Sequence, residues 1–170
     1  MKHEESNLQR QCVAWFRAQY PQYAMLLTHP ANEGNGNRVS GAIHKAEGTM
    51  AGVPDLILFL PVLSASLGFD IEDRRELGYI HGLGIELKTA KGRQSQSQKD
   101  FQHIFESAGY AYYIVRTFNE FRTVMNNWIS WSDPETRKSI ASAHVEIRQA
   151  ENEREKMKLQ RIITPKTHKQ

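Results

Sequence analysis

The 170-residue chain predicts an α/β sandwich, because helix-like and strand-like segments alternate along it. A helical repeat of apolar residues runs through residues 4–20. A continuous apolar run of strand length follows at 56–60, and a second strand-like segment, in which Glu86 lies between apolar residues, follows at 85–87. A second helical repeat over 96–108 leads into a strand-like segment at 110–115. With one more short strand near the N-terminus, the order α-β-β-β-α-β is typical of a layered α/β domain.

The N-terminal quarter of the chain predicts a helix and a short strand. The helix over 4–20 ends before Pro21, and its apolar stripe consists of Leu8, Cys12, Trp15 and Phe16. The apolar segment 23–27 predicts the first strand. Residues 32–38 are too rich in Gly and Asn for regular structure, and 39–48 predicts a short helix that ends near Gly48.

The middle of the chain predicts two central strands separated by an insertion. The run 56–60 is apolar throughout, which predicts a strand covered on both faces, and Pro61 ends it. Residues 62–80 contain a dense group of charges, so we expect an insertion or a long hairpin loop there. The next strand is expected at 85–87.

The following segments complete the predicted domain. A polar loop over 91–98 leads into the helix at 96–108, with Gly109 as its C-terminal cap. The strand at 110–115 is rich in β-branched and aromatic residues. A further helix is expected at 118–128.

A charged helical extension is expected after this domain. Asp133-Pro134 predicts a helix start, since Pro is favoured in the first turn. The chain is then polar and helix-prone to about residue 161, with a heptad too weak for a coiled coil. We therefore expect a folded domain over 1–130 and a docked or protruding helical extension over 131–170.

Composition narrows the class of protein. The net charge of +3 mildly favours a polyanionic partner. Cys12 is the only cysteine, which excludes an intrachain disulfide and a cysteine metal cluster. The sequence contains no apolar run of membrane-spanning length and no signal-peptide pattern. The simplest expectation is a soluble protein in a reducing, cytoplasmic setting, without a membrane partner.

Two carboxylates stand inside apolar runs. Asp55 directly precedes the strand at 56–60, and Glu86 lies within Gly84-Ile85-Glu86-Leu87-Lys88. Ionised carboxylates are rarely buried unless they are paired or bound to a metal. Mg²⁺ prefers oxygen ligands and is usually held by one or two carboxylates, with water and substrate phosphate completing its shell. Asp55 and Glu86 therefore predict a metal site, to which the carbonyl of Leu87 would add a third ligand.

Lys88 extends this candidate site. Side chains alternate along a strand, so Lys88 shares the face of Glu86. It would hold an attacking water or neutralise charge that develops on a phosphate. The alternative interpretation is structural for each residue: Asp55 as a turn residue after Pro54, and Glu86 and Lys88 as solvated side chains of an edge strand.

These motifs resemble the PD-(D/E)xK nucleases, and more closely their VRR-NUC branch, which includes stand-alone phage and bacterial endonucleases. The resemblance covers roughly residues 4–122 and lies in five ordered segments: Glu5-Ser6-Asn7-Leu8-Gln9, Gly52-Val53-Pro54-Asp55, Ile85-Glu86-Leu87-Lys88, Gly92-Arg93-Gln94-Ser95-Gln96-Ser97-Gln98, and Gly109-Tyr110 with Tyr113-Ile114-Val115-Arg116. The distance from Asp55 to Glu86 is long for the motif, and the insertion at 62–80 accounts for it.

The resemblance implies a restriction-endonuclease-like core with a mixed sheet flanked by helices. It further implies a DNA endonuclease that depends on Mg²⁺ or Mn²⁺. Asp55 and Glu86 would be metal ligands and Lys88 the catalytic lysine. Glu5 would be an accessory metal ligand or a nearby supporting group, and Gln98 would orient Lys88, water or phosphate. Branched-DNA cleavage, including four-way Holliday junctions, by a homodimer is a further implication.

Several assignments keep open alternatives. Glu4 competes with Glu5, and an acidic residue in a first helical turn needs no function. Gln9 fits a structural capping box with Ser6. Basic and amide side chains near the site are candidate DNA contacts, although such residues are often only solvated surface: Lys91, Arg93, Lys99, Asn32 and Arg38. The alternative function is a DNA-binding module of the same fold without cleavage activity.

Overall fold

The computed structural model describes residues 2–30, 46–64 and 78–163. The chain divides into two compact units, Met1–Asp133 and Pro134–Gln170. None of the helices in these described ranges combines the length and the apolarity needed to cross a bilayer.

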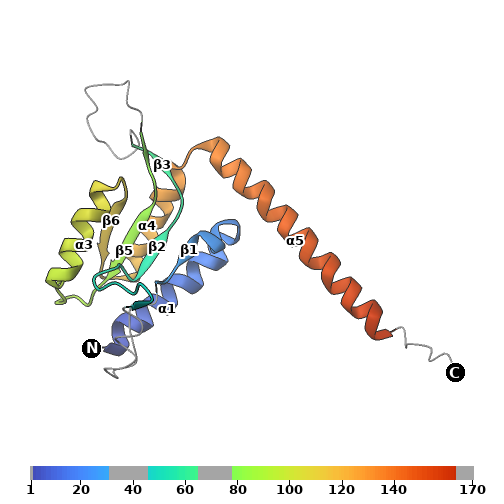
Figure 1. Ribbon diagram of the computed structural model, residues 1–170, viewed down its shortest axis with the longest axis horizontal. Coiled ribbons are helices and arrows are strands. Elements are labelled where there is room, and N and C mark those ends of the chain that lie inside the picture. The colour runs from blue at the N-terminus through green and yellow to red at the C-terminus, as the bar shows by residue number, and fades with distance from the viewer. Residues whose placement is uncertain (1, 31–45, 65–77, 164–170) are drawn as a thin grey trace. The chain divides into compact units, whose positions relative to one another are not determined.

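The first unit is built on a four-stranded mixed sheet of order β1-β2-β5-β6 (Figure 1). The strands are β1 (Leu27–Thr28), β2 (Leu56–Leu58), β5 (Leu83–Leu87) and β6 (Ala111–Val115). β1 is antiparallel to β2 and β2 is antiparallel to β5, whereas β5 and β6 are parallel. A helix joins the parallel pair, as such a crossover requires. The predicted α/β class with a mixed central sheet is confirmed.

Three helices flank this sheet: α1 (Lys2–Gln19), α3 (Gln96–Ser107) and α4 (Phe118–Trp131). Each matches a helix that the sequence periodicity predicts. α1 and α4 pack against each other, and α3 packs on β6. The core combines apolar side chains of all layers, including Phe16, Leu58, Ile85, Phe121 and Trp128, each fully buried.

The alternation of side chains along β5 decides what faces α3. Gly84 faces this helix, because a Cβ atom there would lie 2.9 Å from the ring of Phe105. Glu86 and Lys88 follow at intervals of two residues and therefore face the same side. The apolar Leu83, Ile85 and Leu87 alternate with them and are buried.

The strand predicted at 23–27 is wrong over most of its length. Pro21–Leu26 form a 3-10 helix, η1, and only Leu27 lies in β1. Pro21 at the first helical position presets the backbone φ angle, and the Tyr23 N–H donates to the Tyr20 carbonyl at 3.0 Å. The sheet ladder reaches only the end of η1, where Phe59 N–H donates to Leu26 O at 2.9 Å.

The expected strand at 56–60 is shorter than its apolar run. β2 ends at Leu58, Phe59 is 48% exposed, and Leu60 is buried. The Leu60 carbonyl accepts a hydrogen bond from Trp128 Nε1 at 2.9 Å. Pro61 and the contact of Leu60 with α4 therefore take this segment out of the sheet.

The segment predicted as an insertion or hairpin begins and ends as a hairpin. β3 (Val62–Leu63) pairs antiparallel with β4 (Tyr79–Ile80). The residues between 64 and 78 lie outside the described ranges. So do the whole of the Gly/Asn-rich loop at 32–38 and residues 39–45 of the helix predicted at 39–48. Of that predicted helix only residues 46–48 are described, and Gly48 has a φ angle of +97°.

The described residues of the second unit form one helix, α5 (Pro134–Ile163), of 30 residues. It begins at the predicted Pro134 and extends slightly past the predicted end. Nearly all of its described side chains are exposed or partly exposed, and its ion pairs are local, between residues three apart. Its apolar residues do not concentrate on one face, in keeping with the weak heptad in the sequence.

Candidate active site

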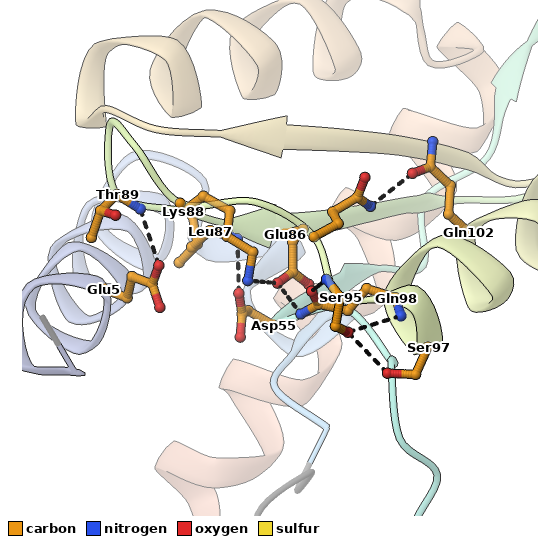
Figure 2. Close-up of polar contacts among 12 residues, drawn as sticks. Glu5, Asp55, Glu86, Leu87, Lys88, Thr89, Ser95, Ser97, Gln98 and Gln102 are labelled. Atoms are coloured by element: carbon orange, nitrogen blue, oxygen red, sulfur yellow. Dashed lines mark hydrogen bonds and ion pairs between the residues drawn. The ribbon is translucent and has the colours of Figure 1, made fainter.

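The register of β2 on β5 brings the two motif carboxylates together. Leu56 pairs with Ile85, so extending the antiparallel register by one residue puts Asp55 opposite Glu86. Asp55 Oδ2 accepts a hydrogen bond from the Leu87 N–H at 2.8 Å. Just before β2, the Asp55 carboxylate therefore takes the place of a backbone carbonyl as the acceptor for the Leu87 N–H, and it holds the end of β5 (Figure 2).

Glu86 is the most deeply buried charged group of this site, with 1% of its surface exposed. Its Oε1 atom forms an ion pair with Lys88 Nζ at 2.6 Å and accepts a hydrogen bond from Gln98 Nε2. Its Oε2 atom accepts a hydrogen bond from the Tyr112 hydroxyl at 3.3 Å. Three donors thus converge on one carboxylate, which offsets much of the cost of burying its charge.

Burial dominates the protonation of both carboxyl groups. It raises the pKa of Glu86, the ion pair with Lys88 opposes this rise, and the neighbouring charge of Asp55 adds to it. Burial likewise raises the pKa of Asp55, against the hydrogen bond from Leu87 and the charge of Lys88. A positive charge bound between the two groups would favour their ionised forms.

The donor chemistry here fits a hard divalent cation. Two carboxylates are what a protein usually supplies to Mg²⁺. Within the described ranges, no group of three or more His, Cys, Asp or Glu side chains has the geometry of a metal cluster. Asp55 and Glu86 would therefore share the ion with water and substrate. The Leu87 N–H is used by Asp55, and the role expected for the Leu87 carbonyl stays a prediction.

Glu5 approaches the same end of β5 from α1. Its Oε1 atom accepts a hydrogen bond from the Thr89 N–H at 3.0 Å, one residue beyond Lys88. Glu4 is exposed, whereas Glu5 is partly buried. Both line a hollow of about 220 Å³ that Lys88 and Arg116 also line. Of the two competing residues, Glu5 is the one with a hydrogen bond to this strand.

Gln98 connects α3 to Glu86 through a capping box. Its Oε1 atom accepts from the Ser95 N–H at 2.8 Å, and Ser95 Oγ accepts from the Gln98 N–H at 3.3 Å. The amide oxygen is thereby fixed at the helix start, and the amide nitrogen points at Glu86. A capping interaction that is ordinarily structural here orients a donor toward the site.

Gly52 allows the Asp55 segment to lie against this helix start. Its φ angle is +91°, and an added Cβ atom would lie 2.2 Å from the Ser97 carbonyl oxygen. Such a distance is far below van der Waals contact, so only glycine fits. The glycine of the Gly52-Val53-Pro54-Asp55 motif is therefore explained by a backbone approach and not by flexibility.

Sequence reasoning missed two residues that support the site. The Tyr112 hydroxyl, on β6, donates to Glu86 Oε2. Tyr112 pairs with Gly84, and both residues lie on the face of the sheet that carries Glu86. Arg116 Nη1 donates to the carbonyls of Thr89 and Gly92, at 2.6 and 2.9 Å, and so holds the loop after Lys88. Alternation along the last strand would have indicated Tyr112 if its register with β5 had been known.

Three of the predicted DNA contacts surround this site. Lys91 and Arg93 are exposed in the loop after β5, and Lys99 is exposed in the first turn of α3, next to Gln98. Asn32 and Arg38 lie outside the described residues. The three described residues are accessible to a polyanion, and their contact with DNA stays a prediction.

Comparison with known proteins identifies a similar fold. No protein-family model matches the chain, and no curated protein matches it. A solved structure described as a "VRR_NUC domain protein" matches with a TM-score of 0.58 and 20% sequence identity. The match covers 76% of this chain and 90% of that chain. The first unit therefore has a VRR_NUC-like α/β fold, in which β2 and β5 bring Asp55 and Glu86 together.

Proposed function

We propose that this chain is a DNA endonuclease that hydrolyses phosphodiester bonds with Mg²⁺ or Mn²⁺. The fold similarity to a VRR_NUC domain protein suggests a nuclease-type domain. The observation that carries the proposal is the contact of buried Glu86 with Lys88, beside Asp55, at one end of the sheet. A buried glutamate beside a partly buried aspartate and an adjacent lysine, in a VRR_NUC-like fold, is better explained by phosphate chemistry than by stability alone.

The two carboxylates would hold the ion, with Glu5 on the α1 side as an accessory group. Asp55 is kept in place by the Leu87 N–H, and Glu86 by three donors, so both are oriented before substrate arrives. When bound, the ion would lower the pKa of a coordinated water and polarise a phosphoryl oxygen.

Lys88 would act on the substrate side of Glu86. Its ammonium group is 2.6 Å from Glu86 Oε1 and 13% of its side chain is exposed, so it can reach an entering phosphate or water. There it would position the attacking water and offset the negative charge that develops on the phosphate. Gln98 contacts the same carboxylate oxygen and would keep Lys88 and Glu86 aligned.

The finer proposal is that the substrate is branched DNA, such as a four-way junction, cut by a homodimer. Its basis is the sequence resemblance to the VRR-NUC branch. Two copies related by a two-fold axis would present two matched sites to a symmetric junction. Light scattering coupled to gel filtration tests the dimer, and a monomer at working concentration would reject it.

The experiment is a cleavage assay on linear, flap and four-way-junction DNA, with and without Mg²⁺ or Mn²⁺. Asp55→Ala and Glu86→Ala are expected to lower the cleavage rate by about a thousand-fold or more, since each removes a metal ligand. DNA binding, measured in parallel, should survive. Glu153→Ala, on the exposed face of α5, is the matched control and should cleave normally.

Metal-dependent cleavage that persists in both site variants would overturn the assignment of these residues. No cleavage of any substrate by the unmodified chain, with DNA binding intact, would favour the alternative of a DNA-binding module.

A further inference from the structure

A groove of about 470 Å³ runs along one face of α1. Its lining is mostly apolar and includes Val13 and Ala14, and its polar groups come from Ser6, Gln9, Arg10 and Arg17 of the helix and from His29 after β1. The spacings of three, four and seven residues put the helical members on one face. α1 therefore has an apolar face in the core and a concave outer face, on which Arg10 and Arg17 accompany a mostly apolar lining.

The groove reaches the candidate active site at the His29 end. The His29 Nδ1–H donates to the Asp55 carbonyl at 2.6 Å, so His29 links the groove to the segment that carries Asp55. Burial is the main influence on the Asp55 pKa and raises it, and the nearby His29 side chain opposes the rise. Gln9 lies one turn from Glu5, which bonds the end of β5.

The charge of this groove has one sign. Arg10 and Arg17 are both exposed, and the described residues that line the groove include no carboxylate. Arg10 is steadied by Asn7 Oδ1 at 2.6 Å and by the Ser6 carbonyl at 3.3 Å. A guanidinium group has five N–H donors, so donors remain for an anion.

The dimensions of the groove suit an extended chain of phosphates. From Ser6 to Arg17 the helix rises about 16 Å, at about 1.5 Å per residue. This length corresponds to roughly five nucleotides at about 3.4 Å per nucleotide of one strand. Glu5 lies on the α1 side of Asp55 and Lys88, and Gln98 lies on their α3 side (Figure 2). A strand that crosses the site toward Lys99 would therefore extend over α1 on its other side.

We propose that this α1 groove binds the phosphate backbone of the DNA strand that enters the active site, with Arg10 and Arg17 as phosphate contacts. The inference rests on the proposed nuclease function and adds a binding surface on the Glu5 side of the site. Such contacts position a strand without reading its sequence.

The test compares Arg10→Gln/Arg17→Gln with the unmodified chain. Binding of a labelled single strand of about 20 nucleotides, well beyond the proposed footprint, is followed by fluorescence anisotropy over a series of salt concentrations. The plot of the logarithm of the association constant against the logarithm of the salt concentration has a negative slope. Losing two phosphate contacts should make this slope shallower by about 1.4, and Kd should rise about tenfold. In cleavage, KM should rise while kcat stays within about twofold, because uniform binding is lost.

Arg148→Gln/Arg154→Gln, in α5, removes the same charge and is the matched control. The variant Arg10→Lys/Arg17→Lys should keep the salt slope of the unmodified chain, because lysine neutralises phosphate as a point charge. The groove proposal would be overturned by an unchanged salt slope in the groove variant or by an equal loss of slope in the control. It would also be overturned if the unmodified chain did not bind the strand. A chain that binds DNA but never cleaves it would contradict the nuclease proposal. If only the groove variant then shows a reduced salt dependence of binding, the proposal that the groove binds phosphates is still supported.

Discussion

Two lysine–glutamate ion pairs in this molecule have similar lengths and opposite surroundings. Lys88 Nζ lies 2.6 Å from Glu86 Oε1, with side-chain exposures of 13% and 1%. In α5, Lys156 Nζ lies 2.8 Å from Glu153 Oε1, with exposures of 67% and 66%. Water screens the second pair and weakens it, whereas the first pair is coupled to a network of buried groups. Burial, more than contact distance, makes one pair a candidate active site and the other ordinary surface.

The largest expected difference follows from removing the lysine of each pair. Lys88→Met would leave the Glu86 charge buried with fewer donors, and should lower the free energy of unfolding at neutral pH by about 3 kcal/mol. Lys156→Met should change it by about 0.5 kcal/mol or less. Denaturant unfolding of both variants measures the contrast. Equal losses of stability in the two variants would show that burial does not distinguish the two ion pairs.

A smaller effect is expected from the hydroxyl that faces Glu86. Tyr112→Phe removes the donor to Glu86 Oε2 and leaves the ring in place, so cleavage should fall about tenfold while the fold is kept. Tyr113→Phe, on the other face of β6 and 36% exposed, is the matched control. Equal cleavage by the two variants would show that Tyr112 does not position the carboxylate.

The smallest expected effect is a pH dependence of stability in metal-free protein. Burial in the folded state raises the pKa of both Asp55 and Glu86. At pH values between the ordinary carboxyl pKa, about 4, and these raised values, the folded chain therefore binds more protons than the unfolded chain. Stability should therefore increase as the pH falls into this window. Thermal melts in chelator should show the increase.

The double variant Asp55→Asn/Glu86→Gln should flatten this pH dependence, whereas Glu151→Gln/Glu153→Gln in α5 should leave it intact. A dependence that survives in the first variant would mean that other groups cause it.

Much of the fold could be predicted because its signals are local. The helical repeats of α1, α3 and α4 and the apolar run of β5 each depend on neighbours a few residues apart. The segment 23–27 shows where this fails: its apolar composition suits a strand, but Pro21 and the packing of buried Tyr23 select a 3-10 helix. Pro21 is a local signal and the packing of Tyr23 a tertiary one, and together they override the strand propensity of the apolar residues.

The residue types available for the chemistry can be read from the chain: two acids beside or within apolar segments, a lysine two residues after the second, and a glutamine at a helix start. Which of them meet depends on how the strands and helices pack. Register puts Asp55 opposite Glu86, the β5–β6 pairing adds Tyr112, and the approach of Gly52 to Ser97 joins α3 to the Asp55 segment. Another contact of the site, the hydrogen bond of Glu5 with Thr89, joins residues 84 positions apart. No local pattern encodes them, because strand pairing and packing are settled only when the whole sheet forms.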